Sequence, residues 1–483
     1  MFYAISKKSN NILFCSEMPS MLGMRCESSK LNAQRAYDYL IYQVQDKGFD
    51  TFIDGVNHVP PAHWLKINLG KPFKIVTERW WNPKINQTST LSFNDAASHL
   101  RELFLDSVKL HLRSDVPLGV ALSGGLDSSA ITCAIRYLEP KIELHTFSYV
   151  ATKSSLSEES WVDIVNKYTN AISHKIMVNT GDLENDIKSL IQVQGEPFCT
   201  TSMYAQYRVF KEAKDAGIKV VLEGQGADEL LAGYHGYHGQ RMRSLFEQRK
   251  FLDMLRFAYR WKKWPGRERL SPWSALVGQL IPDNLYKSLQ AFAGVRSLPS
   301  WMNEKLLQDL NINTKPIRLD REKSASGRRV TEVLFRAISE GGLPSLLRYG
   351  DRNAMNFSIE NRVPFLTIPL AEFLLSLPEK YLISEDGQTK YLFRTAMRGI
   401  VPNEIIDRRD KVGFETPMGD WVANLASKVA WSDKFGERGY LWKERKLSAH
   451  FKSIINNGQA FSPQDWRLLN LKLWMQINLD DNS

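Results

Sequence analysis

The sequence predicts an α/β protein built around a doubly wound parallel sheet, with a largely helical C-terminal part. Two short apolar runs, Val116–Leu122 and Lys219–Leu222, each end in a glycine-rich turn. Buried parallel strands have this pattern because both of their faces are covered. Helical patterns separate these runs from other strand candidates, and strands that alternate with helices form parallel sheets.

Residues 1–84 are expected to form a small β-rich unit ahead of this sheet. One helical stretch, Asn32–Gln43, lies among short apolar pieces with turn residues between them. Pro83 and the polar stretch after it indicate a linker, so we divide the chain into residues 1–84 and 85–483. The strand candidates of the first unit are Phe2–Ile5, Ile12–Cys15, Trp64–Ile67 and Phe73–Thr77.

The second unit begins with a helix from about Ser92 to Leu112, which leads into the first strand of the sheet. Leu144–Val150 is a further strand candidate, and Ile176–Val178 is a weaker one. From Arg329 to the C-terminus helical patterns dominate.

Residues 240–320 are expected to form a helical, basic insert. Between Arg241 and Leu270 there are ten lysines and arginines against three acids, interleaved with aromatic residues. This composition is compatible with RNA binding. We favour a solvated helical insert whose aromatic side chains pack inward, and we expect no nucleic-acid partner.

Composition points to a globular protein outside the membrane. The chain of 483 residues is 43% apolar and 24% charged, and it has no apolar stretch of about 18 residues. Its four cysteines are widely scattered without the pairing typical of metal sites, which suits a reducing compartment. We therefore expect a cytoplasmic protein with no membrane partner.

A glycine- and serine-rich turn, Ser123–Ser129, follows the first strand and leads into a helix. Glycines let the backbone approach a phosphate, and the amide groups, the helix dipole and the serine hydroxyls attract it. A tight turn alone would explain the glycines but not three serines and an aspartate. The residues assigned to phosphate binding are Leu122, Ser123, Gly124, Gly125, Asp127, Ser128 and Ser129.

Asp127 would repel a bare phosphate, so we predict that it holds Mg²⁺ against a polyphosphate. The sequence has no Gly-x-x-x-x-Gly-Lys-Ser/Thr loop, and Gly224-Gln-Gly226 lacks the third glycine of a dinucleotide fingerprint. The Ser-Gly-Gly-x-Asp-Ser-Ser form instead resembles the pyrophosphate loop of the ATP pyrophosphatases. That resemblance implies a sheet of the ATP-pyrophosphatase type and cleavage of ATP into AMP and pyrophosphate.

A second glycine turn, Glu223–Glu229, follows the strand Lys219–Leu222 and carries two acids, Asp228 and Glu229. Asp228 alone could be a helix cap. Because strand ends of a parallel sheet meet at one edge, we expect Asp127 and Asp228 to hold one magnesium ion. Gly224 and Gly226 are assigned to the same ATP site.

Several ordered segments now resemble the synthetase domain of glutamine-dependent asparagine synthetases, over about residues 90–425. They are Glu196-Pro197, Asp351–Met355, Ser358–Leu366, Lys390–Arg394 and Arg408–Phe414. The resemblance implies ATP and Mg²⁺ as cofactors and catalytic roles for Lys411, Asp228 and Glu229. A fixed cation such as Lys411 would stabilise the charge that develops during adenylation; the alternative is a solvated surface lysine.

The segment before residue 84 resembles only the last part of that family's glutaminase domain, through Asn11–Glu17, Val59–His63 and Glu78–Pro83. The family's glutaminase needs an N-terminal cysteine, and residue 2 here is Phe. We therefore expect a truncated gene product or another nitrogen source, and no hydrolysis of glutamine by this chain alone. Free ammonia, a separate glutaminase subunit or an amine within the substrate would supply the nitrogen.

Two departures from the family pattern fall near the expected site. Gln225 and Thr367 stand where the family commonly has acids, and glutamine cannot accept a proton. Both weaken the case for plain asparagine synthesis. A different carboxylate is the alternative, as in the related β-lactam synthetases and lasso-peptide cyclases, the latter acting on a precursor peptide.

The sequence thus predicts an AMP-forming ligase that adenylates a small-molecule carboxylate, by default the aspartate side chain, and transfers ammonia or another amine to it. A tRNA-modifying ATP pyrophosphatase is a competing hypothesis, but it would need a cysteine pair or an RNA-binding domain that the sequence does not display. A non-catalytic ATP-binding relative is a third, permitted by Gln225 and Thr367.

Overall fold

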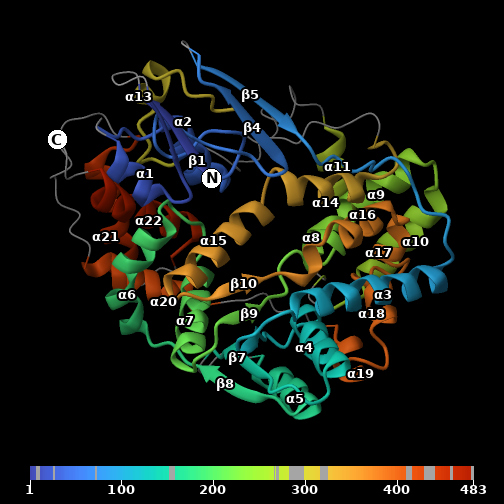
Figure 1. Cartoon of the computed structure of the whole chain (residues 1–483). Coiled ribbons are helices and arrows are strands. Elements are labelled where there is room, and N and C mark those ends of the chain that lie inside the picture. Colours follow the sequence, from blue (N-terminus) through green and yellow to red (C-terminus); the bar gives the residue numbers. More distant parts are fainter. Residues whose placement is uncertain are drawn as a thin grey trace.

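The computed structural model describes most of the chain. The described residues are 1–6, 11–25, 28–70, 73–151, 158–265, 267, 271–281, 298–315, 325–409, 416–428, 441–456 and 461–479. Figure 1 shows the N-terminal strands along one side of the molecule and the strands β7, β8, β9 and β10 in the opposite half.

The centre of the molecule is a five-stranded sheet whose neighbouring strands all run parallel, as predicted. Its order is β10-β9-β6-β7-β8, so the chain moves outward from β6 and then returns to the other side of it. A reversal of this kind opens a crevice at the carboxyl ends of the strands on either side. The strands are β6 (Leu118–Ala121), β7 (His145–Tyr149), β8 (Ile172–Ile176), β9 (Val220–Leu222) and β10 (Glu360–Arg362).

Helices cover both faces of this sheet, and β9 shows how. Val220 and Leu222 belong to one core with the side chains of α4 (Leu126–Leu138), whereas Val221 belongs to a second core with those of α7 (Ser202–Asp215). Successive side chains of a strand point to opposite faces, so α4 and α7 lie on opposite sides of the sheet.

Two strands of this sheet differ from the sequence prediction, and both are edge strands. β8 lies at Ile172–Ile176 rather than at Ile176–Val178, because its residues pair with His145–Tyr149 and are mostly exposed, so they lack an apolar signal. β10 has the polar sequence Glu-Asn-Arg and was not predicted. Edge strands need fewer apolar side chains because one side of the strand faces solvent.

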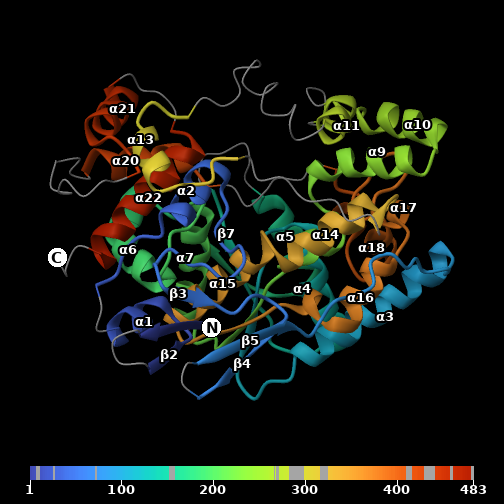
Figure 2. The same cartoon turned by 90° about the horizontal axis from the view of Figure 1, so that it is seen from above.

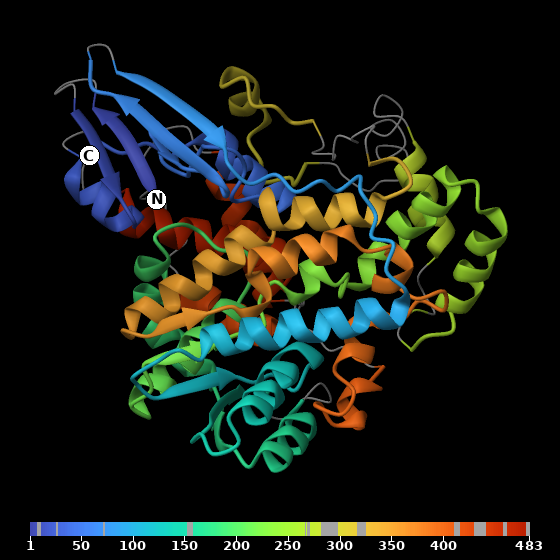
Figure 3. The same ribbon diagram turned by 45° about the vertical axis from the view of Figure 1, so that its right-hand side comes forward.

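The remaining helices of this part follow. Near the sheet lie α3 (Phe93–His111), α5 (Glu159–Thr169), α6 (Thr180–Gln194) and α8 (Ala227–Leu230); further along come α14 (Arg329–Ser339), α15 (Leu343–Asn356), α16 (Ile368–Ser376), α17 (Glu379–Leu382), α18 (Tyr391–Ala396), α19 (Asn403–Ile406) and α20 (Met418–Lys428). Figure 3 shows α14, α16 and α3 side by side in that order. No helix in the described part of the chain has both the length and the apolar character needed to cross a membrane.

The N-terminal segment is β-rich, as expected. Its strands β1 (Phe2–Ser6), β2 (Asn11–Cys15) and β3 (Val56–His58) form one antiparallel sheet, and β4 (His63–Asn68) pairs with β5 (Lys74–Arg79). Its helices are α1 (Met18–Met24) and α2 (Ala33–Tyr42).

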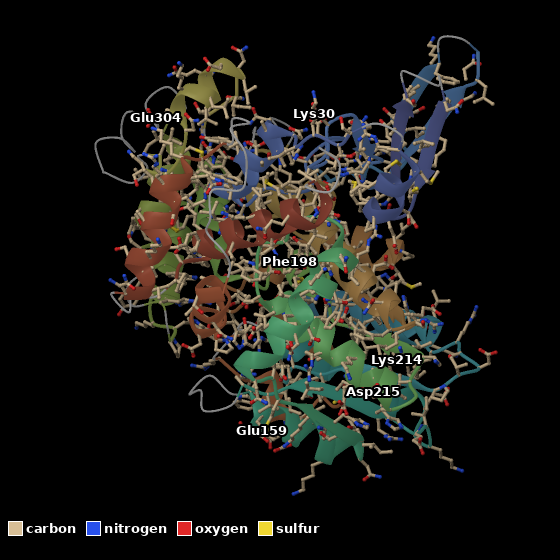
Figure 4. All side chains as sticks on the ribbon, turned by 90° about the vertical axis from the view of Figure 1, so that its left-hand side faces the viewer. Lys30, Glu159, Phe198, Lys214, Asp215 and Glu304 are labelled. Atoms are coloured by element: carbon tan, nitrogen blue, oxygen red, sulfur yellow. The ribbon has the colours of Figure 1, made fainter. Side chains whose placement is uncertain are left out.

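This segment shares its core with the rest of the chain. The Tyr39 hydroxyl donates to the carbonyl oxygen of Phe198 at 2.8 Å, and the Trp466 indole donates to the same oxygen at 3.2 Å. Figure 4 shows Phe198 in the middle of the molecule, away from the exposed Lys30 and the half-buried Glu159. The N-terminal segment and the C-terminal helix α22 (Pro463–Asn478) therefore meet at one buried residue.

The described helices of the stretch 240–320 lie in two separate places. Figure 2 shows α9 (His238–Glu247), α10 (Phe251–Trp261) and α11 (Pro272–Leu280) packed together, with α13 (Glu304–Asp309) apart from them. Just before α13, the Asn303 amide donates to the carbonyl oxygen of Leu441 at 2.8 Å, in the segment that leads into α21 (Glu444–Asn456). Inward packing of the aromatic side chains holds for Trp261, which is buried. The expectation is wrong for Tyr259 and Phe251 of α10, whose exposed fractions are 67% and 50%.

Candidate active site

A cavity of about 620 Å³ opens at the carboxyl ends of β6 and β9. Its walls come from the loop between β6 and α4, the turn between β9 and α8, the first turns of α7 and the segments around α18 and α19. This is the edge of the sheet at which the sequence placed the phosphate loop and the second glycine turn.

Glycines determine the backbone conformation of the phosphate loop, and serine hydroxyls stabilise it through hydrogen bonds. Gly124 has a φ of +78°, and a Cβ at this position would lie 2.9 Å from the Cβ of Trp161, so only glycine fits. The Ser128 hydroxyl accepts from the Ser123 amide at 3.1 Å, and the Ser123 hydroxyl accepts from the Gly125 amide at 3.3 Å. Gly125 is the N-cap of α4 and offers no side-chain cap, which leaves the first amides of the helix to an anion.

Asp127 and Asp228 come together at Lys390. The Lys390 ammonium forms ion pairs with Asp127 Oδ2 and, at 2.6 Å, with Asp228 Oδ1. The turns approach closely because Gly224 has no side chain: a Cβ there would lie 3.2 Å from the Cβ of Asp127. The predicted convergence of the two aspartates is therefore present in the structure.

Lys390 is held in place by its backbone and by burial. It adopts a left-handed conformation with φ of +55°, just before α18, and its side chain is 5% exposed. Burial by itself would lower the pKa of Lys390, but Asp127 and Asp228 outweigh that effect and raise it. The lysine is therefore a fixed cation beside the phosphate loop.

The two aspartates suit a magnesium ion that is shared with a polyphosphate. Asp127 Oδ1 is buried and accepts no hydrogen bond from any described residue. Within the described ranges, no cluster of three or more histidine, cysteine, aspartate or glutamate side chains could hold a metal by itself. One or two carboxylates with phosphate and water oxygens are the usual ligands of Mg²⁺, so the donor set fits.

Arginines line the cavity beside the phosphate loop. Arg408 pairs with Glu158 at 2.8 Å, donates to the Gly124 carbonyl at 3.2 Å and stacks over Trp161. Arg394 also lines the cavity, and its partial burial lowers its pKa. Together with Lys390 they give this end of the cavity a positive wall, as a site for a polyanion requires.

Of the other residues assigned to ATP, Leu122 and Gly224 line the cavity, and the Ser129 hydroxyl is buried without a hydrogen bond to a described residue. Gly226 packs against Leu366 and caps α8 with a φ of +89°. Glu229 is buried behind the cavity wall and accepts a hydrogen bond of 2.6 Å from Tyr234; burial raises its pKa. Lys411 lies outside the described residues.

The two residues that depart from the family pattern differ in their position relative to the cavity. Gln225 lines the cavity, whereas Thr367 is the N-cap of α16 and is not among the cavity-lining residues. Sequence reasoning missed Lys390, Arg394 and Arg408 as cavity residues, and it gave no role to Glu223, which begins the second glycine turn. The first three lie in segments that carry the family resemblance, so a signal was present without an assigned role.

The fold and the site define a class: an α/β protein with a phosphate-type loop and a pair of aspartates at the edge of a parallel sheet. Within that class, the chain belongs to the asparagine synthase family, whose model matches residues 99–476. The family match covers every described element that lines the cavity.

The curated relatives carry names from the same family. The chain is 27% identical to "Asparagine synthetase [glutamine-hydrolyzing] 1" of Bacillus subtilis over 423 residues, which is 79% of this chain and 59% of that protein. It is also 27% identical to "Asparagine synthetase [glutamine-hydrolyzing] 3" of the same bacterium, covering 74% of this chain and 53% of the relative. A putative asparagine synthetase of Mycobacterium tuberculosis is 27% identical over 77% of this chain and 56% of its own length. The chain thus spans little more than half the length of these relatives.

Proposed function

We propose that this chain is an ATP-dependent carbon–nitrogen ligase that adenylates a carboxylate, transfers an amine to it and releases AMP and pyrophosphate. The observation that carries the proposal is the meeting of Asp127 and Asp228 at Lys390 beside the phosphate loop. We assign the sheet to the ATP-pyrophosphatase type because its order reverses at β6 and the loop lies at that reversal.

Each group of polar or charged residues around the phosphate loop has its own role in the proposed reaction. Amides at the start of α4 and the hydroxyls of Ser123 and Ser128 would bind the departing pyrophosphate. Asp127 and Asp228 would hold Mg²⁺, which supplies charge neutralisation on the phosphate oxygens. Lys390 and Arg408 would stabilise negative charge that develops there, and Lys411 is proposed for the same role by its motif.

The default substrate is the aspartate side chain, with asparagine as the product, since the matched relatives are asparagine synthetases. Gln225 in the cavity wall keeps another carboxylate open, in a small molecule or a precursor peptide. Ammonia, an amine of the substrate or a separate glutaminase subunit would supply the nitrogen. The described cysteines are free thiols, which supports a cytoplasmic setting.

The test is a product analysis of the purified chain with ATP, Mg²⁺, aspartate and either ammonia or glutamine. We expect AMP and pyrophosphate in equal amounts together with an amide detected by mass spectrometry. The Asp127→Asn variant should lose this activity, because a neutral amide is a weaker ligand for Mg²⁺. ADP as the nucleotide product would contradict the proposal, whichever amine is present.

A further inference from the structure

Glu223 is a buried acid at the end of β9 that lines the cavity and has no cationic partner. Its side chain is 5% exposed, and within the described part of the chain no lysine, arginine or histidine pairs with it. Of the four other buried glutamates among the described residues, three pair with an arginine: Glu196 with Arg348 at 3.7 Å, Glu332 with Arg329 at 2.7 Å and Glu379 with Arg241 at 3.2 Å. The fourth, Glu229, accepts a hydrogen bond from Tyr234 and has the Lys390 charge nearby. Burying an unpaired carboxylate is costly, so its retention in a cavity wall calls for a ligand.

Neutral amides hold the carboxylate in position without neutralising it. Gln206 Nε2 donates to Oε1 at 2.8 Å, and Asn361 Nδ2 donates to Oε2 at 2.6 Å. The orientation of Gln206 is fixed because its Oε1 accepts from Asn353 Nδ2 at 3.1 Å. Both carboxylate oxygens are thus acceptors, and each keeps a second lone pair for another donor.

The carboxylate lies in the gap between α7 and α15, and the cavity reaches that gap. Met203 and Gln206 of α7 and Leu346 of α15 line the cavity. Gly350 brings α15 close, since a Cβ there would lie 3.2 Å from Glu223 Oε2. The next residue in the chain, Gly224, packs against the start of α4, so this gap adjoins the phosphate loop.

We propose that Glu223 binds a cationic amino group of the carboxylate substrate, so that the substrate is a zwitterion such as an amino acid. The inference rests on the proposed function, because it names the class of acid that is adenylated. An ammonium group donates hydrogen bonds and supplies the positive charge that the carboxylate lacks. The arrangement differs from a family-type acid at position 225, which is glutamine here.

The proposal predicts selectivity between acids that differ only in an amino group. Binding is measured from the thermal shift of the full chain with Mg²⁺ and α,β-methylene-ATP, which cannot be cleaved. The probes are the twenty common amino acids, together with the pairs aspartate and succinate, and glutamate and glutarate. At least one amino acid should bind, and its des-amino partner should bind about 30-fold more weakly or not at all, as expected for loss of a buried charged hydrogen bond.

Variants assign the selectivity to Glu223. Glu223→Gln should weaken amino-acid binding about 30-fold or more, and Glu340→Gln, at an exposed helix end, should leave it unchanged. The exchange Glu223→Gln/Gln206→Glu keeps the hydrogen bonds to Asn361 and Asn353 and returns the charge to the neighbouring side chain. It should recover part of the selectivity, which a merely structural role for Glu223 would not do.

Three outcomes overturn the proposal. The first is equal binding of amino and des-amino acids, or binding of neither by the wild type. The second is unchanged amino-acid binding in Glu223→Gln. The third is that Glu223→Gln loses binding of the ATP analogue and keeps binding of the amino acid, which would make Glu223 a ligand of the ribose hydroxyls. Because this readout needs no turnover, it is separate from failure to form AMP, which would overturn the proposed function instead.

Discussion

Lys390 lies between Asp127 and Asp228 with its side chain 5% exposed, 162 residues after the second of them. Removing one partner of a buried ion pair leaves the other charge uncompensated, which typically costs about 3–5 kcal/mol. The lysine therefore stabilises the site as well as serving its proposed chemistry.

At the residue scale, we predict that Lys390→Met lowers the rate of AMP formation by about 100-fold or more, as for other losses of a fixed group that stabilises developing charge. Without Mg²⁺ its melting temperature should fall, because Asp127 and Asp228 then face each other without a cation. Mg²⁺ alone should raise the melting temperature more in this variant than in the wild type. Calorimetry with and without Mg²⁺ checks this, with exposed Lys141→Met as the control; equal responses of both variants would refute it.

Sequence reasoning could find Asp127 and Asp228 because each follows a strand directly, and parallel strand ends meet. Lys390 could not be placed in this way, since it precedes a short helix and reaches the site through a left-handed backbone conformation. Glu223 was visible in the second turn, but its burial and its lack of a cation are properties of packing between α7 and α15. Such contacts between distant segments leave no pattern in a local stretch of sequence.

At the scale of elements, the sequence predicts best where packing is regular. The strands β6, β7 and β9 and the helices α3 and α4 lie within a few residues of their predictions. The edge strands β8 and β10 did not follow from periodicity, because tertiary pairing rather than an apolar pattern determines them. Helix ends with side-chain caps, such as that of α22, carry a stronger local signal.

α22 begins with a reciprocal cap that also links it to α21. The Ser462 amide donates to Asp465 Oδ2 at 2.8 Å, and His450 Nε2 contacts Asp465 Oδ1 at 2.7 Å. Burial would raise the pKa of Asp465, but the hydrogen bonds from His450 and Ser462 outweigh it, and the pKa is lowered. Stability from an acid with a depressed pKa is present above its unfolded pKa and is lost as pH falls through its folded pKa.

We predict that Asp465→Asn destabilises the protein by about 1–2 kcal/mol at pH 7, as for the loss of a helix cap. The difference from wild type should shrink as pH falls below about 4, where the wild-type carboxylate also becomes neutral. Thermal unfolding at several pH values measures this, with Asp420→Asn, an exposed acid in the first turn of α20, for comparison. A difference that stays constant with pH would show that charge on Asp465 does not matter.

At the scale of the whole molecule, a largely buried arginine joins the N-terminal segment to the helices behind the site. Arg348 of α15 pairs with Asp46 at 3.1 Å and with Glu196 at 3.7 Å. Burial alone would lower the pKa of Arg348, but Asp46 and Glu196 outweigh that effect and raise it. The arginine therefore stays charged. The pKa of Asp46 is lowered, because Arg348 and Ser345 outweigh its burial.

We predict that Arg348→Met destabilises the chain by about 3–5 kcal/mol, because it leaves two buried carboxylates without a cation. The matched control is Arg398→Met, which removes a 2.5 Å pair with Asp407 whose partners are 51% and 57% exposed. That exposed pair should contribute about 0–1 kcal/mol to the free energy of unfolding. Urea midpoints compare the two variants, and limited proteolysis should cut residues 1–84 faster only in Arg348→Met. Equal losses in both variants would argue against a structural role for the buried cluster.

On the proposed function, the position of Lys390 would also make the binding of metal and of nucleotide interdependent. A magnesium ion and the lysine ammonium would compete for the same two carboxylates, so a bare divalent ion would gain little by replacing a charge that is already there. Nucleotide phosphates offer the ammonium a new partner, and the carboxylates then become available to the ion. By thermodynamic reciprocity, nucleotide must strengthen ion binding by the same factor by which the ion strengthens nucleotide binding. One lysine would thereby make the site respond to the complex of the two rather than to either one alone.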